Sequence, residues 1–467
     1  MSAPPSISYS ITARLELPAV GSGVGLLTAA VEQAGGLVTA LDVTGSDVDR
    51  MHMDVTCAAS STEHAENIVA ALDAVHGVRV HKVSDRTFLM HLGGTIEMVS
   101  KHAIRNRDDL SMIYTPGVAR ICRAIADDPE DARRLTVKRN AVAVVTDGSA
   151  VLGLGNLGPT AALPVMEGKA ALLKRFAGID AWPLCLDTQD SDEIVRTVAA
   201  IAPGFAAINL EDIAAPRCFQ IERRLRELLD IPVFHDDQHG TAIVVLAALT
   251  NALRVVGKHL PDVRIVLVGA GAAGTAVVRL LLHAGAGTGR GSVTVTDVGG
   301  IVHTGRADLD PDLRWIAQNT NLERGTGTLH DALRGADVFV GVSAPNLIGA
   351  DDVATMAPDS VVFALANPYP EIDPAEARKH AAVVASGRSD HPNQINNVLA
   401  FPGVFRGLLD ARSRMITLDV LQAAAVAIAR VVTDDELNAS YVVPSVFHPD
   451  VHGAVAEAVT AAAKQAR

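Results

Sequence analysis

One short segment restricts the fold of this chain more than any other: an apolar run followed directly by three closely spaced glycines. Val263-Arg-Ile-Val-Leu-Val268 has the pattern of a buried strand, and a helical pattern begins at Thr275. In such a loop the first glycine permits a tight turn, the second lets the backbone approach a pyrophosphate, and the third allows close helix–strand packing. Since the loop has a predicted strand before it and a predicted helix after it, we interpret it as a dinucleotide-binding loop. Its residues are Gly269, Ala270, Gly271, Ala272, Ala273 and Gly274.

The chain around this loop predicts a doubly wound parallel sheet of the Rossmann type, because strand patterns continue to alternate with helical ones. The predicted strands are Val263–Gly269, Ser292–Asp297, Val338–Val342, Val361–Ala366 and Ala382–Ala385. A long apolar helix is predicted from Gly240 to Val256, and the Ala-rich tail from Ile416 to Arg467 is also predicted to be helical. We assign residues 240–415 to an NAD-binding domain and residues 416–467 to a C-terminal helical segment.

Asp297 ends the second strand of this unit, near the place where an acidic residue usually bonds the ribose 2′-hydroxyl. The residues after it contain no Arg or Lys before Arg306. A 2′-phosphate would therefore face a carboxylate without a nearby cation, which favours NAD over NADP. The alternative is that Asp297 is simply the exposed end of a strand.

The first segment, residues 1–98, predicts a separate ferredoxin-like unit with the order βαββαβ. The predicted elements are a strand at 7–17, a Gly-rich turn at 19–25, a helix at 26–33, strands at 37–43 and 51–57, a helix at 62–75 and a strand at 78–85. This unit resembles an ACT domain, the small ligand-sensing module attached to many metabolic enzymes. Two roles remain open for it, a site for a small-molecule effector and a structural dimerisation module.

Two pairs of acidic residues follow short apolar strands in the middle segment, residues 99–239. Glu211 and Asp212 follow the strand Ala206–Leu210, and Asp236 and Asp237 follow the strand Ile231–Phe234. Ligands of α/β folds bind at the carboxyl ends of strands, and convergent carboxylates need a cation between them to stay ionised. Oxygen ligands without a thiolate suit Mg²⁺ or Mn²⁺. The alternative is that each pair lies in an exposed loop or caps a helix; the flanking His235 and His239 are interpreted as structural.

A tyrosine and a lysine are the remaining candidates. Tyr114 is one of four tyrosines and is predicted in a turn before a helix whose first residue is Pro116. Lys169 is predicted at the start of a helix, where the helix dipole and a nearby metal ion would disfavour its ammonium and make it a base at about neutral pH. The alternatives are a half-buried anchor for Tyr114 and a surface position for Lys169.

Composition excludes several classes of protein. With 40 Lys and Arg against 53 Asp and Glu, the net charge of −13 argues against a nucleic-acid partner. No membrane span and no secretory signal is apparent. Cys57, Cys122, Cys185 and Cys218 are far apart, so we expect buried, reduced thiols in a cytoplasmic protein, with neither a disulfide framework nor a zinc site.

Eight motifs in order make the chain similar to malic enzymes, of the shorter microbial branch. They are Tyr114-Thr-Pro-Gly-Val118, Gly153-Leu-Gly-Asn-Leu-Gly158, Pro164-Val-Met-Glu-Gly-Lys169, Asn209-Leu-Glu-Asp212, Phe234-His-Asp-Asp-Gln-His-Gly-Thr241, Gly269-Ala-Gly271, Ala366-Asn-Pro368 and Asn396-Asn-Val-Leu-Ala-Phe-Pro-Gly403. The resemblance implies oxidative decarboxylation of L-malate to pyruvate and CO₂ with NAD and a divalent metal. It also implies a homodimer or a higher homo-oligomer.

The resemblance further implies roles for single residues. Glu211, Asp212 and Asp237 would bind the metal, and Asp236 would hold Lys169 or a metal-bound water. Lys169 would be the general base and would contact substrate, and Tyr114 would be the general acid. Asn367 and Asn397 would contact the nicotinamide ribose or substrate carboxylates, with Asn396 as a neighbouring candidate, and Ser343 would lie near the nicotinamide.

One stretch departs from the family pattern. Larger malic enzymes carry an Arg for a malate carboxylate shortly before the Gly-Leu-Gly string, whereas this chain has Asp147-Gly-Ser-Ala150 there. Four alternatives to the main interpretation remain. The same chemistry could use NADP, or malate could be converted to lactate with tightly held NAD. The chain could also be an ACT-based amino-acid sensor without catalysis, or a metal-independent 2-hydroxy acid dehydrogenase, against which the paired carboxylates argue.

Overall fold

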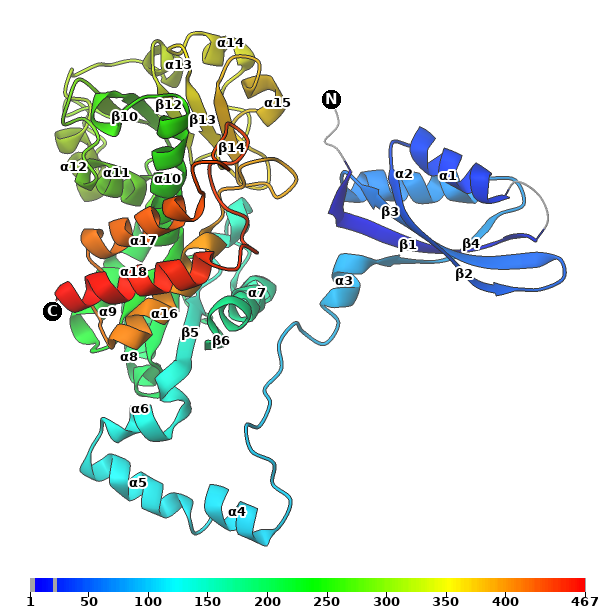
Figure 1. Cartoon of the computed structure of the whole chain (residues 1–467), viewed down its shortest axis with the longest axis horizontal. Helices are drawn as coiled ribbons and strands as arrows, with labels where there is room; N and C mark the ends of the chain where they lie inside the picture. The colour runs from blue at the N-terminus through cyan, green and yellow to red at the C-terminus, as the bar shows by residue number, and fades with distance from the viewer. Residues whose placement is uncertain (1–4, 20–22, 467) are drawn as a thin grey trace. The chain divides into compact units, whose positions relative to one another are not determined.

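The computed structural model describes residues 5–19 and 23–466 and divides into two units, Met1–Glu97 and Met98–Arg467 (Figure 1). The N-terminal unit contains β1 (Ser6–Pro18), α1 (Gly23–Gln33), β2 (Leu37–Ser46), β3 (Arg50–Ala59), α2 (Thr62–Asp73), β4 (Arg79–Asp85) and the short α3 (Arg86–Met90). Its antiparallel sheet has the order β2-β3-β1-β4, so the predicted ferredoxin-like topology is confirmed. Residues 20–22 of the predicted Gly-rich turn lie outside the described residues, and Gly23–Gly25 belong to α1.

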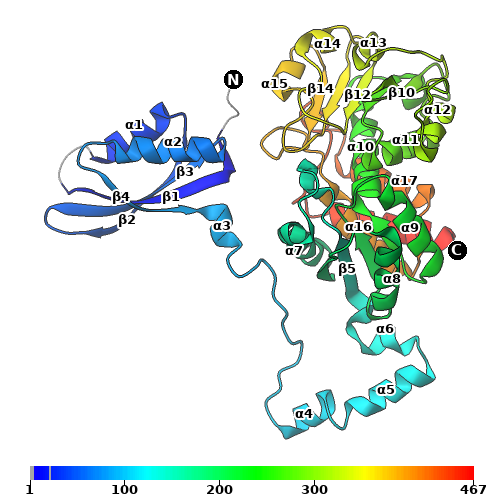
Figure 2. The same cartoon turned by 180° about the vertical axis from the view of Figure 1, so that it is seen from behind.

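The core of the N-terminal unit forms where α1 and α2 cover one face of this sheet (Figure 2). Alternate residues of β1 point into it, so that Leu15 and Leu17 are fully buried together with Leu27 of α1 and Ile68 and Leu72 of α2. This period of two along the strand and the helical spacing in α2 are the patterns that made the unit predictable.

The second unit has two halves, which we name the substrate half and the NAD-binding half after the domains predicted from the sequence. The first contains a parallel sheet with the strand order β6-β5-β7-β8. Its elements are β5 (Ala141–Thr146), α7 (Pro159–Ala177), β6 (Asp180–Cys185), α8 (Ser191–Ile201), β7 (Ala207–Leu210), α9 (Arg217–Leu228), β8 (Val233–His235) and α10 (Asp236–Val255). The sequence analysis did not predict β5 and β6. All four carboxyl ends lie on one edge of the sheet because the strands are parallel.

The NAD-binding half has a sheet of order β11-β10-β9-β12-β13-β14, parallel except for β11, so the predicted Rossmann-type sheet is confirmed. Its strands are β9 (Arg264–Val268), β10 (Ser292–Asp297), β11 (Gly300–Ile301), β12 (Val338–Gly341), β13 (Val361–Ala364) and β14 (Val383–Ser386). Its helices are α11 (Ala272–His283), α12 (Pro311–Asn319), α13 (Leu329–Leu333), α14 (Ala350–Ala354) and α15 (Pro374–Ala377).

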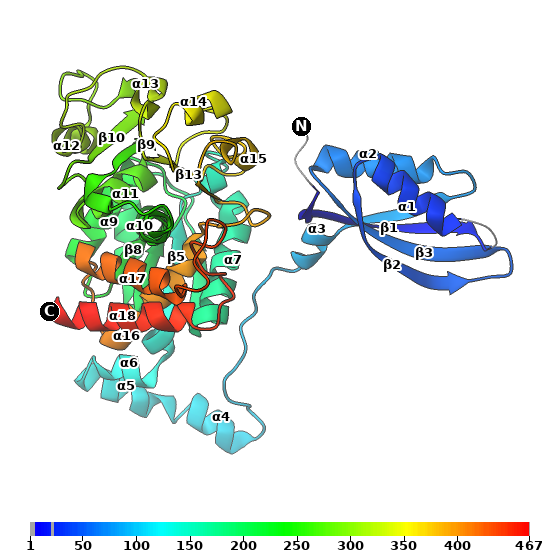
Figure 3. The ribbon, with the colours of Figure 1, turned by 45° about the horizontal axis from the view of Figure 1, so that its top comes forward.

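The helix α10 joins the two halves, since one continuous core includes residues of both sheets and most of this helix (Figure 3). It begins at Asp236, earlier than the predicted start at Gly240, and so carries Asp236 and Asp237 in its first turn, where acidic side chains favour the helix dipole. The helix α16 (Phe401–Ala411) precedes the tail, which forms α17 (Leu418–Val431) and α18 (Val451–Gln465). The prediction of a wholly helical tail is wrong for residues 432–450, which connect α17 to α18.

Before β5 the chain forms three short helices, α4 (Arg107–Ile113), α5 (Val118–Asp127) and α6 (Asp131–Leu135). We call α4, α5 and the turn between them, residues 107–127, the arm. The thiol of Cys122 on α5 is exposed, which corrects the expectation of four buried thiols, whereas Cys57 and Cys218 are buried. In the described ranges no helix has both the length and the apolar character needed to cross a bilayer.

Candidate active site

The acidic residues that follow β7 and β8 converge at the carboxyl edge of the substrate sheet. Glu211, Asp212 and Asp237 each offer one carboxylate oxygen, and these oxygens lie within 4.8 Å of one another. The strands are hydrogen-bonded neighbours, which is why residues far apart in sequence meet here. The backbone amide of Asp212 also donates to Oδ2 of Asp237 at 2.8 Å, so the two strand ends are fixed to each other.

Two features of this cluster and its neighbour Asp236 favour a bound cation. Asp212 has a φ of 55°, a left-handed conformation that few non-glycine residues adopt and that aims its carboxylate at the cluster's other side chains only in this local turn of the backbone. Among the described residues, Oδ2 of Asp212 and Oδ1 of Asp236 are buried without a hydrogen-bond partner. A buried, unpartnered carboxylate oxygen is costly, and a metal ion supplies the missing interaction.

The electrostatics of the cluster point the same way. Burial, reinforced by Asp237 and the other carboxylates, raises the pKa of Glu211 to about 8 and that of Asp212 to about 7. Burial also disfavours the ionised form of Asp237, but its contact with His235 keeps its pKa below the usual value. An all-oxygen set of crowded carboxylates fits Mg²⁺ or Mn²⁺, because a divalent ion neutralises the repulsion that raises these pKa values.

Lys169 lies beside this cluster, but its predicted position at a helix start is wrong. It is in the second half of α7, far from the first turn, so the dipole of that helix end does not act on it. Its Nζ is 2.6 Å from Oδ2 of Asp236 and 2.8 Å from Oε1 of Glu211, and it lies 4.3 Å from the ring centroid of Phe401. Burial disfavours the ammonium, but the two carboxylates outweigh it and raise the pKa of Lys169, contrary to the expected lowering.

Asp236 is completely buried and connects Lys169 to a further predicted residue. Its Oδ2 accepts hydrogen bonds from Lys169 and from the side-chain amide of Asn397, the latter at 3.2 Å. The helix leaves no room for a side chain at Gly240, where a Cβ would lie 2.0 Å from Oδ1 of Asp236. The structure therefore brings Asp236, Lys169 and Asn397 together with the carboxylate cluster.

The glycine loop after β9 has the geometry of a pyrophosphate cradle. Gly269 has a φ of 107°, and a Cβ on Gly274 would lie only 1.7 Å from the carbonyl oxygen of Gly269, so the turn requires both glycines. A Cβ at Gly271 would meet no atom within 4 Å, so the space in front of this residue is open. The helix α11 starts at Ala272, slightly earlier than predicted, and its first amides face this space.

The pattern of the malic enzyme N-terminal domain matches residues 93–226, and that of the malic enzyme NAD-binding domain matches residues 238–464. The chain belongs to the malic enzyme family. It is 53% identical to an NAD-dependent malic enzyme of Geobacillus stearothermophilus over 463 residues, 99% of this chain and 96% of the relative. It is also 50% identical to a bifunctional malic/malolactic enzyme of Bacillus subtilis, over 84% of this chain and 93% of the relative.

Solved malic enzyme structures have the same fold. The malic enzyme of Pyrococcus horikoshii superimposes with a TM-score of 0.76 and 48% identity, over 80% of this chain and 87% of its own. The NAD-dependent malic enzyme of Thermotoga maritima gives the same TM-score at 47% identity, over 81% of this chain and 99% of its own. The resemblance seen in the sequence is thereby confirmed at the level of family and fold.

One predicted residue of this malic enzyme is not at the site. Tyr114 is the C-terminal cap of α4, and 68% of its surface is exposed. The next helix, α5, begins at Val118, so the prediction that Pro116 is its first residue is also wrong. The arm that carries Tyr114 continues through α6 into the amino end of β5, whereas Lys169 and the carboxylates lie at the carboxyl edge of the sheet.

Asp297 lies at the end of β10 as predicted, but the expectation that no cation is near it is wrong. Nη1 of Arg306 is 2.6 Å from Oδ1 of Asp297, and the amide of Gly299 donates to the same oxygen at 2.7 Å. Arg306 also pairs with Asp308 at 2.6 Å. The guanidinium is thus held between two carboxylates. Arg306 reaches the end of β10 because the loop after this strand folds back toward it.

Ser343, predicted near the nicotinamide, and Asn367, predicted to contact the nicotinamide ribose or substrate carboxylates, are both exposed and follow the neighbouring strands β12 and β13. The sequence analysis did not identify the residue that arranges them, the buried Glu371. Its carboxylate accepts hydrogen bonds from the backbone amides of Ser343 at 2.9 Å and Ala366 at 3.1 Å. Glu371 belongs to no motif, so its role is visible only once these two loops are brought together.

A second unpredicted feature is a chain of polar contacts behind the cluster. The side-chain amide of Gln238 lies 3.0 Å from Oε2 of Glu222 and 2.8 Å from Nδ1 of His235, and Nε2 of His235 lies 3.1 Å from Oδ2 of Asp237. Because Gln238 donates to Nδ1, the nitrogen of His235 that faces Asp237 is the protonated Nε2. Burial disfavours the charged imidazole, but the contact with Asp237 outweighs it and raises the pKa of His235. His239 contacts Glu222 at 2.6 Å, so both histidines support the site from outside it.

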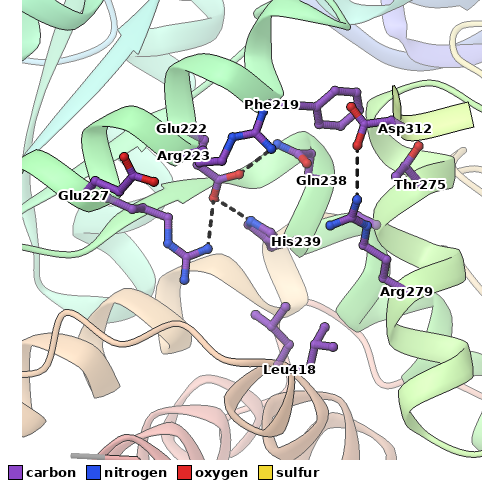
Figure 4. Close-up of a pocket in the computed structure, with 13 residues that line it drawn as sticks. Phe219, Glu222, Arg223, Glu227, Gln238, His239, Thr275, Arg279, Asp312 and Leu418 are labelled. Atoms are coloured by element: carbon purple, nitrogen blue, oxygen red, sulfur yellow. Dashed lines mark hydrogen bonds and ion pairs between the residues drawn. The ribbon is translucent and has the colours of Figure 1, made fainter. Parts of the chain in front are cut away.

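This chain of contacts ends at a cavity of about 350 Å³ between α9, α10, α11 and α17, with Glu222 and Gln238 on its wall (Figure 4). Its wall also includes Thr275, which directly follows the glycine loop. Glu222 is buried, and the neighbouring His239 holds the pKa of its carboxyl below the usual value despite that burial.

Proposed function

We propose that this malic enzyme oxidatively decarboxylates L-malate to pyruvate and CO₂, reduces NAD, and requires Mg²⁺ or Mn²⁺. The observation that carries the proposal is the convergence of Glu211, Asp212 and Asp237 beside Lys169 at one sheet edge. A metal-independent 2-hydroxy acid dehydrogenase has no need of such a cluster. Decarboxylation does, since charge develops on the C2 oxygen when the carboxylate leaves as CO₂.

The residues of the chain have the following roles in the proposed mechanism. When bound, the cation would polarise the C2 oxygen of malate and the nicotinamide would accept the hydride from C2. Lys169 takes the proton of the C2 hydroxyl. Asp236 orients the side chain of Lys169, and Asn397 in turn holds Asp236. Tyr114 delivers a proton to C3 after CO₂ has left, which gives pyruvate.

The raised pKa of Lys169 favours its ammonium form, which must release a proton before Lys169 can act as a base. Glu211 and Asp236 support the ammonium, and Glu211 is also a predicted metal ligand. A cation shared by Glu211, Asp212 and Asp237 would withdraw negative charge from Lys169 and so lower its pKa. The pKa of Lys169, and so its ability to accept a proton, thus depends on whether these carboxylates hold a metal ion.

NAD is favoured over NADP by the position of Asp297 beside the ribose site and by the neutralisation of Arg306 by two carboxylates. Ser343 is proposed to lie near the nicotinamide, and Asn367 to contact the nicotinamide ribose or a substrate carboxylate. The domain boundaries at residues 98, 239 and 415 remain predictions. We further propose a homodimer or higher oligomer, a cytoplasmic location, and a small-molecule effector for the N-terminal unit, whose ferredoxin-like topology is that of ACT modules.

The test is an assay of the purified protein with L-malate and Mn²⁺, in which NADH and NADPH formation are followed separately and pyruvate is measured. We expect NADH and pyruvate in equal amounts, with complete loss after EDTA treatment. NADPH formation at a higher rate would contradict the assignment of Asp297. Lactate without free NADH would favour the malolactic alternative, which the name of the Bacillus subtilis relative makes a specific second candidate.

A further inference from the structure

A buried ion pair at the carboxyl edge of the substrate sheet has no part in the proposed mechanism. Nη2 of Arg217, the first residue of α9, lies 2.9 Å from Oδ2 of Asp147, which directly follows β5. The side chain of Asp147 is completely buried, and Nε of Arg217 is buried without a hydrogen-bond partner within residues 5–19 and 23–466. A buried pair that leaves a donor unpartnered adds little net stability, so stability alone does not explain it.

The other carboxylate oxygen of Asp147 fixes Ser149. It accepts hydrogen bonds from the backbone amide of Ser149 at 3.0 Å and from the hydroxyl of the same residue at 2.5 Å. Because the hydroxyl proton is used there, Oγ of Ser149 can only accept elsewhere, and it receives the amide of Ala214 at 2.9 Å. Asp147, Ser149 and Arg217, which we call the Asp147 network, therefore join the end of β5 to the segment 212–217 after β7.

The segment held in this way contains Asp212, one of the three clustered carboxylates. The carbonyl oxygen of Asp212 accepts the amide of Ala150 at 3.0 Å, and its Oδ1 accepts the amide of Leu152 at 3.5 Å. Both donors belong to the same loop as Ser149, so the Asp147 network also fixes the loop that supplies them. A non-glycine residue keeps a φ of 55° only where the surrounding contacts enforce it, and these bonds provide such contacts.

The backbone conformation of Asp212 decides where its carboxylate points. A negative φ would turn the Cα–Cβ bond of Asp212 relative to the fixed chain on either side, and its oxygens would leave the group that lies within 4.8 Å of Glu211 and Asp237. A metal site tolerates errors of only about 0.2 Å in its ligand distances. The position of this ligand atom therefore depends on contacts that lie outside the carboxylate cluster.

We propose that Asp147, Ser149 and Arg217 are positioning residues for the metal, which act by holding Asp212 in its left-handed conformation. The stretch Asp147-Gly-Ser-Ala150, which lacks the Arg expected from larger malic enzymes, receives a guanidinium from α9 instead. Partners of this kind orient a metal ligand without touching the ion. This inference deepens the proposed function and rests on the assignment of Asp212 as a metal ligand.

The test measures Mn²⁺ binding to the full-length protein by titration calorimetry, without substrate or nucleotide. Ser149→Ala removes the hydroxyl that holds the amide of Ala214, and Arg217→Gln removes the cation beside Asp147. Each should weaken Mn²⁺ binding by about 10–100-fold, the range for an outer partner of a metal ligand. Arg217→Lys keeps the charge without the planar fork and should lose less affinity. If Arg217→Gln fails to fold because Asp147 is left as a buried unpaired charge, Ser149→Ala and Arg217→Lys decide the question.

Matched controls separate an effect on Asp212 from a general effect on the fold. Arg224→Gln alters another arginine of α9, which pairs with the exposed Asp192 at 2.6 Å, and should bind Mn²⁺ as the wild type does. Affinity for NADH, followed by nucleotide fluorescence, should be unchanged in every variant. In a chain that already carries Asp212→Asn, adding Ser149→Ala should cause almost no further loss of Mn²⁺ affinity, because substitutions that act through one residue are not additive.

The outcomes distinguish this inference from the proposed function. Weaker Mn²⁺ binding with unchanged NADH binding and no additivity with Asp212→Asn supports the inference. Wild-type Mn²⁺ affinity in folded Ser149→Ala and Arg217 variants would overturn it, and so would equal losses for Mn²⁺ and NADH or additive losses in the double variant. Wild-type Mn²⁺ affinity in Asp212→Asn would instead overturn the ligand assignment on which the inference rests.

Discussion

The carboxylate cluster and the arm supply residues to one proposed reaction, but they are stabilised in opposite ways. Asp236 and Glu211 are buried and fixed by partners from neighbouring strands and helices of their own chain. Tyr114 is exposed on a helix end with no buried neighbour in its own helix. The difference teaches that the metal and base functions depend on the fold of one chain, whereas the acid function depends on what the arm contacts.

The largest effect on kcat should come from a substitution of the exposed Tyr114. Tyr114→Phe should lower kcat by about 10²–10⁴-fold, the range for loss of a general acid. It should change the free energy of unfolding of the chain by less than about 0.5 kcal/mol, since residues 5–19 and 23–466 offer the hydroxyl no hydrogen-bond partner. Steady-state kinetics and thermal unfolding of the same samples check both statements. A variant that unfolds more easily by several kcal/mol would mean that Tyr114 has a structural role.

Asp212→Asn tests the buried carboxylate cluster. It removes one of three charged ligands and should weaken Mn²⁺ binding by more than the roughly 10–100-fold typical of outer partners of a metal site. Titration calorimetry with Mn²⁺ measures the change without any assay of activity. Asp192→Asn, which alters an exposed carboxylate paired with Arg224, is the matched control and should bind Mn²⁺ as the wild type does. Unchanged affinity in Asp212→Asn would exclude this residue as a ligand.

Gln238→Met tests whether the polar contacts behind the cluster act on the metal. Without the amide, His235 loses the hydrogen bond that fixes its proton toward Asp237, and Glu222 loses a buried partner. We expect a loss of about 10–100-fold in Mn²⁺ affinity, with a smaller change in the KM for NAD. Gln465→Met, on the exposed end of α18, is the control. Equal losses for the metal and for NAD would indicate a general disturbance of α10.

The smallest effect concerns cofactor choice. Asp297→Ala removes the proposed ribose contact and leaves Arg306 with one carboxylate partner, so the ratio of kcat/KM for NADP to that for NAD should rise about tenfold, or about 1.4 kcal/mol. Asp308→Ala frees the same guanidinium on its other side and should leave the ratio almost unchanged. A similar gain in both variants would show that the charge of Arg306 alone sets the preference.

The sequence predicted best those features that depend on neighbours along the chain. The ferredoxin-like unit, the Rossmann-type sheet and the glycine loop follow from local periodicity and turn chemistry, and each is confirmed. The carboxylates could be chosen because each pair directly follows an apolar strand, and parallel strands end at a common edge.

Features that depend on distant parts of the chain were predicted poorly. Lys169 was predicted at the start of a helix, but Pro159 starts α7 and the helix continues through Pro164 and Gly168. The pKa of Lys169 was expected to be lowered but is raised, because Asp236, which favours the ammonium, lies far from Lys169 in the sequence. Arg306 and Glu371 were missed for the same reason, since each acts on a strand end across a loop.

The helix α10 has a mechanical consequence for catalysis. Its first turn holds Asp236 and Asp237, and its remaining length is buried against α11 and α17. Any rotation that closes the NAD-binding half over bound substrate must therefore either bend this helix or move its first turn together with its buried length. If the helix stays straight, movement of the NAD-binding half would also move Asp236, which contacts Lys169, and Asp237, a proposed metal ligand. The pKa of Lys169 would then depend on how far the two halves have closed.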